Sequence, residues 1–406
     1  KSFHFVLPSE VLLCKPNTHS FNKLHLESAV EPLPVKKQEK YNIGRWGLAG
    51  RKTVEKNTDC YKIYAYLKKN PNAPQNLWKE LCYFWSSDFR THTETKKEKK
   101  MITRLSKKIK NICRNHIQKE HKESVKSSPF HFKGIRIKKD KTHIFVTSKK
   151  INLVLNSKRG LTIENLVFNE VSTTPLITTL SQGYFNDNDF NADFFSGHST
   201  IDIPGFKKMT DLSPINPTFK TFSSNGENGV TVTGLIPFGY GTVNKSISIF
   251  SESSKIKINY IFSPKIPSKC SFRAGFLTFN PEAFDINTLF YACHNGGFEK
   301  DIFPFGKNAL EITPVSLLVS SRRALGNTAG LIEIGDAKKV ISITTNMQNY
   351  ASLPMLQFKK MLRSPTFFLR TKFSLQEFDD TTIKDKIPSK KPIHFELTIT
   401  ALKKIG

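Results

Sequence analysis

The chain has 406 residues, of which 38% are hydrophobic and 11% aromatic, a composition that excludes a disordered protein and leaves room for two domains. No apolar run approaches the roughly 18 residues that a membrane-spanning helix needs, so we expect no contact with a membrane. Lys and Arg number 62 against 34 Asp and Glu, and the formal net charge is +28.

The positive charge is densest near the N-terminus, where residues 1–128 carry a net charge of +15. Lysines at 96–100 and 107–110 interrupt an amphipathic pattern, which predicts the solvated face of a helix. Because lysine is abundant along the whole chain, we interpret the excess as compositional. Nucleic acid bound through this face is the disfavoured alternative, and an anionic polysaccharide is preferred to it.

The six cysteines follow neither a CxxC spacing nor a regular framework. This pattern favours neither a metal site nor a disulfide scaffold. We therefore expect no metal, no cofactor and a reducing, cytoplasmic location.

Three segments in the first part of the chain repeat apolar residues at helical spacing, and we expect helices at 57–67, within the stretch 78–92 and at about 98–121. In the second segment, the predicted apolar stripe comprises Trp78, Leu81, Cys82 and Trp85. Asp88, Arg90 and His92 follow its last apolar turn. These polar residues form either the mouth of a site or an ordinary surface ion pair beside a tryptophan core.

A glycine-rich loop is predicted at residues 36–51, after a segment that two prolines keep extended. Its three glycines permit close approach of the backbone to another group, with Trp46 and Arg51 beside it. The spacing of the glycines matches no phosphate-binding motif.

The spacing of apolar residues changes from helical to alternating after residue 128. We place the boundary there, between a helical region (1–128) and a second domain (129–406). From residue 130 onward, about a dozen segments alternate apolar and polar residues and are separated by turn residues. Strands in such number without intervening helices predict a large antiparallel β-sandwich. The fold class is therefore α+β, with an N-terminal helical region followed by the sandwich.

One loop of the predicted sandwich mixes carboxylates with aromatic rings. It contains Tyr184, Asp187, Asp193 and His198. Rings stack on the C–H faces of a sugar while acids bind its hydroxyls, so we interpret the loop as a possible secondary sugar site. The alternative is a packed loop whose acids cap turns, and Asp211 is interpreted as another such cap.

Residues 290–299 place His294, Asn295 and Glu299 around two glycines. The pattern indicates a tight hairpin or a further polar site. No GxSxG or HExxH motif supports an esterase or a zinc protease.

Several short segments together carry a resemblance to the bacterial glycoside hydrolases of family 57. They are residues 34–51, 57–60, 85–92, 183–185, 196–198, 272–279, 295–297 and 325–330. The resemblance spans most of the chain, although each segment is weak by itself.

The resemblance implies a catalytic (β/α) barrel, a helical region that closes over the sugar cleft, and a β-sandwich tail of the galactose-mutarotase type. The family's glutamate nucleophile and aspartate acid/base would lie on a barrel upstream of Lys1, so we expect a longer natural chain and assign no catalytic residue here. The substrate contacts that carry over are Trp46, Arg51, Trp85, Asp88, Arg90 and His92.

Two hypotheses follow. In the first, the chain is the C-terminal part of a retaining glycosidase or transglycosidase, acts on oligo- or polysaccharide and packs against its own barrel. In the second, it is a non-catalytic carbohydrate-binding or scaffolding module.

Overall fold

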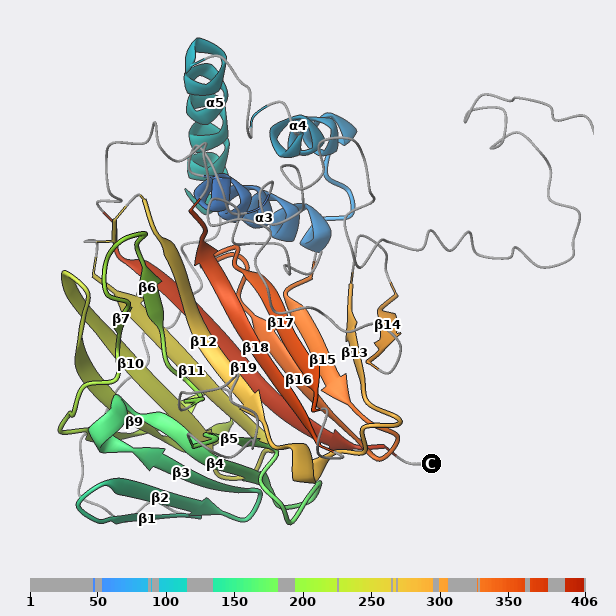
Figure 1. Ribbon diagram of the computed structural model, residues 1–406. Helices are drawn as coiled ribbons and strands as arrows, with labels where there is room; N and C mark the ends of the chain where they lie inside the picture. The colour runs from blue at the N-terminus through green and yellow to red at the C-terminus, as the bar shows by residue number, and fades with distance from the viewer. Residues whose placement is uncertain are drawn as a thin grey trace, which may run out of the picture.

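The computed structural model describes residues 47, 53–86, 89, 95–114, 134–181, 194–224, 226–263, 266–267, 269–294, 299–305, 327, 329–361, 366–378 and 391–404. These residues form three helices at one end of a large β-sandwich (Figure 1). None of these helices is long and apolar enough to cross a membrane. The predicted boundary between residues 128 and 129 lies outside the described ranges and stays a prediction.

The helical region consists of α3 (Thr53–Lys69), α4 (Gln75–Trp85) and α5 (Thr95–Arg114). The three helices share a small apolar core, made of Cys60, Ile63, Leu67, Leu81, Phe84, Phe89, Met101 and Leu105. A buried lysine ties the helices together, because Lys56 of α3 donates to Glu98 of α5 and to the carbonyl oxygen of Phe89, at 2.7 and 3.0 Å.

The helices correct two details of the sequence prediction. α3 starts earlier and ends later than residues 57–67, and the end predicted for the third helix lies outside the described residues. Cys82 is exposed rather than part of the apolar stripe. The buried face of α4 runs through Leu81 and Phe84, and one further residue turns a helix by about 100°, which points Cys82 outward.

The sandwich comprises a ten-stranded and a nine-stranded sheet, and every strand pair is antiparallel. The ten-stranded sheet has the order β1 (Ile135–Lys139), β2 (His143–Ser148), β3 (Ile151–Asn156), β4 (Thr162–Phe168), β5 (Ile177–Thr178), β12 (Ser271–Phe279), β18 (Phe367–Gln376), β17 (Leu353–Lys360); in addition, β6 (Thr200–Asp202) pairs with β12 and with β7 (Met209–Thr210).

The nine-stranded sheet has the order β14 (Asp301–Pro304), β13 (Phe290–Cys293), β15 (Leu331–Gly335), β16 (Lys339–Thr345), β19 (Ile393–Lys403), β11 (Lys255–Phe262), β10 (Gly241–Phe250), β9 (Glu227–Phe238), β8 (Thr218–Ser224). β13 pairs with β14, so the chain reverses between Cys293 and Asp301, while the tight turn predicted at residues 295–297 lies outside the described residues. The predicted helical region and antiparallel sandwich are both confirmed.

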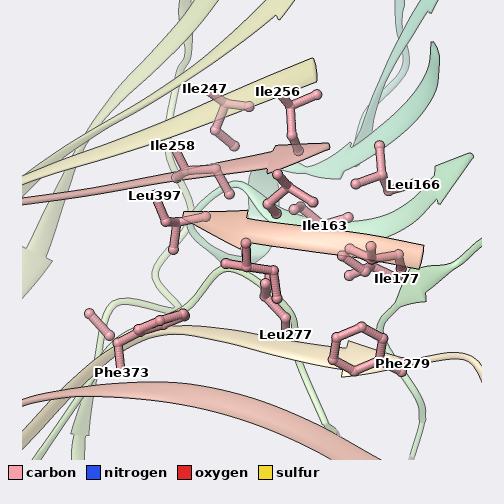
Figure 2. Packing of buried hydrophobic residues seen from close by; sticks show 14 of the residues in the cluster. Ile163, Leu166, Ile177, Ile247, Ile256, Ile258, Leu277, Phe279, Phe373 and Leu397 are labelled. Atoms are coloured by element: carbon pink, nitrogen blue, oxygen red, sulfur yellow. The ribbon is translucent and has the colours of Figure 1, made fainter. Parts of the chain in front are cut away.

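The main core lies between the two sheets. Alternation places every second side chain of each strand there, as in β11, where Ile256, Ile258, Tyr260 and Phe262 are all fully buried. Figure 2 shows side chains of the nine-stranded sheet facing those of the ten-stranded sheet. Branched and aromatic residues suit such a pleated surface, and their burial is the main source of stability.

The helical region packs on β17, an edge strand of the ten-stranded sheet (Figure 1). Val54 of α3 belongs to an apolar cluster with Leu353 and Met355 of β17. Thr58 accepts a hydrogen bond from the backbone N–H of Ala351 at 2.9 Å. The helices therefore lie against the face of β17 that points away from the sandwich core.

Candidate functional site

The ten-stranded sheet carries charged residues on its outer face, the face turned away from the nine-stranded sheet. In β18, Leu369 and Phe373 point into the sandwich core, so the alternate residues Arg370 and Lys372 point outward. Outward charges on a sheet are normally solvated. Here both are buried, with 8% and 9% of their surface exposed.

We call Arg273, Arg370, Lys372 and Glu377 the outer-face cluster. Arg273 of β12 binds Glu377 through two parallel hydrogen bonds, of 2.6 Å from Nε and 2.7 Å from Nη2. The hydroxyls of Ser374 and Ser271 donate to the same carboxylate at 2.6 and 2.9 Å. Glu377 is thus a satisfied carboxylate with four donors, and it is the counter-charge of Arg273.

Burial disfavours the charged form of Arg273, but the adjacent Glu377 carboxylate outweighs this effect and raises the pKa of the guanidinium. Arg370 has no carboxylate partner among the described residues, and burial lowers its pKa to about 9. Burial also holds the pKa of Lys372 well below its ordinary value, an effect that Arg273 reinforces and Glu377 opposes. Among the described residues, the cluster therefore has more positive than negative charge.

The backbone of Phe195 connects the cluster to His198. Its carbonyl oxygen receives hydrogen bonds from Arg370 Nη2 at 2.8 Å and from His198 Nδ1 at 2.9 Å. A carbonyl oxygen can only accept, so Nδ1 carries the proton and Nε2 of the neutral ring is left as an acceptor. Arg370 Nε is buried and has no hydrogen-bond partner among the described residues.

Burial, Arg370 and Lys245 together hold the pKa of His198 well below its ordinary value, and the ring is neutral at pH 7. The imidazole stacks on Phe276 with ring centroids 4.2 Å apart. The guanidinium of Arg370 lies 4.6 Å from the centroid of the same phenyl ring. A neutral imidazole and a cation can share this ring because its face is electron-rich.

A bulge in β12 brings Phe276 to this position. Gly275 has a φ of +60°, and the register of β12 with β18 shifts between Ala274 and Leu277. A Cβ atom at residue 275 would lie 2.5 Å from the side chain of Leu397, so glycine is required on two grounds. The bulge also leaves the carbonyl oxygen of Phe276 free to accept from the N–H of Gly197 at 2.6 Å.

A second buried polar group lies inside the sandwich. Lys245 of β10 forms an ion pair with Asp211 at 2.7 Å and donates to the carbonyl oxygen of Gly160 at 2.7 Å. Asp211 also accepts from the N–H of Ser199 at 2.7 Å. Burial lowers the pKa of Lys245, and Asp211 opposes that effect. The interpretation of Asp211 as a simple turn cap is wrong, because its main partner belongs to a distant strand.

The contacts of β17 place the helical region beside the outer-face cluster. Met355 of β17 is directly opposite Lys372 of β18, and Leu353 is opposite Ser374. Directly opposite residues in an antiparallel pair share a face. Since Val54 and Gly47 lie against these β17 side chains, α3 and Gly47 adjoin the cluster.

Most of the site residues expected from the sequence lie outside the described ranges. They are Trp46, Arg51, Asp88, Arg90, His92, Tyr184, Asp187 and Asp193. Of the others, His198 lies in the site just described. Trp85 is half-buried at the end of α4, with its ring edge-on to Tyr61 at 5.1 Å between centroids.

Sequence reasoning missed Arg273, Arg370, Lys372 and Glu377. The segment 367–374 mixes apolar and polar residues as many strands do, and its Arg and Lys are indistinguishable from those of any solvated strand face. The one local signal was Gly275 within a strand pattern, which indicates a bulge or a close backbone approach. Among the described residues, no group of three or more His, Cys, Asp and Glu side chains could hold a metal ion.

No family model matches the sequence, and a search of curated proteins finds no match. Three solved structures to which the chain is similar are a galactose 1-epimerase from Lactobacillus acidophilus, a galactose mutarotase-like protein from Clostridium acetobutylicum and a 4-alpha-glucanotransferase from Thermococcus litoralis.

The epimerase and the mutarotase-like protein are each 10% identical to this chain, with TM-scores of 0.36 and 0.37. The matches cover 70% and 67% of this chain and 100% of each matched protein. The glucanotransferase match has 9% identity and a TM-score of 0.29, and covers 87% of this chain and 52% of the enzyme. Similarities at this level assign neither a family nor an activity. The family 57 resemblance stays a prediction.

Proposed function

We propose that this chain binds a carbohydrate on the outer face of the ten-stranded sheet, and that it serves as the sugar-binding β-sandwich of a carbohydrate-active protein. One observation carries the proposal. Within the part of the chain that the structure describes, Arg370 Nε has no hydrogen-bond partner, and the neutral ring of His198 has Nε2 as an acceptor, both beside the buried ring of Phe276.

The chemistry of these groups suits a sugar hydroxyl. A hydroxyl both donates and accepts, and Nε of Arg370 supplies a donor while Nε2 of neutral His198 supplies an acceptor. The half-buried ring of Phe194, which lies beside the Arg370 guanidinium, offers apolar surface for the C–H face of a sugar ring. A few fixed polar groups among aromatic side chains are typical of small-ligand sites.

Calorimetric titration of the chain with short oligosaccharides tests the proposal. We expect Arg370→Met to weaken saccharide binding at least tenfold, since the variant removes a donor but retains similar volume. Arg136→Met, which changes an exposed arginine on β1 of the same sheet, is the matched control and leaves the affinity unchanged. Failure of a broad set of neutral and acidic oligosaccharides to bind would contradict the proposal, as would equal affinities of the two variants.

A second candidate function is the predicted one, in which the chain is the C-terminal part of a family-57-like glycosidase and its helical region lines the sugar site. The packing of α3 on Leu353 and Met355, next to the outer-face cluster, favours it. Trp85 and Trp78 provide a matched pair for a test, because both are half-buried on α4 and both contact Tyr64. If the helical region touches the sugar, Trp85→Leu weakens binding and Trp78→Leu changes stability alone. Equal affinities in both variants would contradict this candidate.

A further inference from the structure

The lysines that the structure buries elsewhere show how this fold accommodates a buried ammonium group. Lys56 has a carboxylate at 2.7 Å and a carbonyl oxygen at 3.0 Å. Lys245 also has a carboxylate and a carbonyl oxygen, each at 2.7 Å. In both cases the charge removed from water is matched by an anion and an additional acceptor, as the cost of desolvation requires.

Lys372 departs from this pattern. It is as buried as a core residue, and it makes no hydrogen bond or ion pair with any residue that the structure describes. The carboxylate that acts on it, Glu377, already receives four hydrogen bonds, two of them from Arg273. The outer-face cluster thus contains three cationic side chains and one carboxylate, and that carboxylate is already hydrogen-bonded to other residues.

We propose that the carbohydrate bound at the outer-face cluster is acidic, and that its anionic group, a carboxylate or a sulfate, binds Lys372 while its hydroxyls reach Arg370 and His198. This inference rests on the proposed function and names its ligand class. An anion would give Lys372 the partner that Lys56 and Lys245 already have within the chain. It would also add the charge-assisted hydrogen bonds that are the stronger ones in proteins.

The geometry fits a ligand of saccharide size better than a free anion. Lys372 and Arg370 are two residues apart on one face of β18, a separation of about 7 Å along a strand. A single small anion cannot fill both positions, whereas the carboxylate and ring hydroxyls of one sugar residue span such a distance.

The test compares trigalacturonic acid, a sulfated galactose trisaccharide and neutral galactotriose by calorimetry at one ionic strength, with inorganic sulfate as the free-anion probe. We expect an acidic trisaccharide to bind the wild-type chain at least tenfold more tightly than galactotriose, and inorganic sulfate to bind more weakly than either. The carboxylated and sulfated ligands distinguish the two sources of the anionic group. Lys372→Met removes the preference, and Lys372→Arg retains it.

Lys138→Met, at an exposed lysine of β1 in the same sheet, controls for the overall positive charge and keeps the preference. Thermal melting of each variant verifies folding. Binding of acidic and neutral trisaccharides with equal affinity would overturn the inference and leave the proposed function standing. A preference for acidic sugars that survives in Lys372→Met would also overturn it. Absence of saccharide binding altogether would refute the proposed function, and the inference with it.

Discussion

His198 and Arg370 donate hydrogen bonds to the same acceptor, the carbonyl oxygen of Phe195, at 2.9 and 2.8 Å. The shared acceptor holds a guanidinium next to an imidazole, which disfavours a second positive charge on the ring. His198 is therefore neutral in the folded chain at pH 7, and its protonation is linked to stability.

This linkage predicts a loss of stability in acid. The pKa of His198 is depressed in the folded chain, so below about pH 6.5 the unfolded chain takes up a proton that the folded chain does not. The free energy of unfolding should then fall by up to about 1.4 kcal/mol per pH unit from this residue. We expect His198→Asn, whose amide can still donate to Phe195, to flatten urea-unfolding stability between pH 7 and 5. His143→Asn, at a partly exposed histidine, keeps the wild-type slope. Equal slopes in all three proteins would exclude this role for His198.

Lys245 and Asp211 form a buried ion pair, so we expect the effects of their substitutions on the free energy of unfolding to be strongly coupled. Either Lys245→Met or Asp211→Asn leaves one charged group without its partner, and each should lower the free energy of unfolding by about 3–5 kcal/mol. The double variant should lose less than the sum of the two, as measured by a double-mutant cycle in urea. The partly exposed pair Lys257–Glu396 is the control, with an expected coupling of at most about 1 kcal/mol. Additive losses at Lys245 and Asp211 would contradict the prediction.

Gly160, whose carbonyl oxygen accepts a hydrogen bond from Lys245, has no space for a larger side chain. Its φ is +60°, and a Cβ atom there would lie 1.8 Å from the carbonyl oxygen of Asp211. We expect Gly160→Ala to destabilise the chain by about 3 kcal/mol or more, since strain and a clash with backbone add. Gly205→Ala isolates the strain, because Gly205 has a φ of +81° with no atom within 4 Å of the added Cβ, and should cost about 1–2 kcal/mol. Similar melting temperatures for the two variants would show that the clash is relieved by local movement.

The bond between Thr58 and Ala351 predicts how firmly the helical region is attached to the sandwich. Thr58→Val leaves the buried N–H of Ala351 without an acceptor, at a cost of about 1–3 kcal/mol. We expect faster proteolysis between α3 and α4 in this variant, together with lower stability. Thr103→Val removes an exposed hydroxyl on α5 that bonds only within its own helix, and should change stability by less than about 0.5 kcal/mol. Unchanged proteolysis of Thr58→Val would indicate that the apolar contacts alone hold the helices.

The architecture was largely predictable because its signals are local. In β11, the alternation of Ile256, Ile258 and Tyr260 with polar residues predicts a strand with one buried face wherever the strand lies in the sheet. The same holds for the helical spacing of α3, although its ends were predicted too far inward. Cys82 was assigned to the wrong side of α4. Residues at the edge of a wide apolar stripe can be either buried or exposed, and the sequence pattern does not distinguish the two.

The candidate site was predictable only at His198. That residue stood out because it ends a segment of aromatic and acidic side chains. Arg370 and Lys372 did not stand out, because a strand with polar residues on one face is the ordinary pattern of a half-solvated sheet. Asp211 was assigned a local role for the same reason, and its partner Lys245 is 34 positions away along the chain.

The sequence by itself determined the helical region, the strands and the apolar face of most strands, because side-chain periodicity is a property of consecutive residues. Only the tertiary structure decided that the outer face of β18 is buried, that Glu377 binds Arg273, and that Lys372 has no ion pair with any described residue. Burial of an outer face and the pairing of charges depend on segments far apart in the chain. A charged side chain is well solvated in water. Once those segments bury it, the lost solvation costs free energy unless an opposite charge or a hydrogen-bonding group lies beside it.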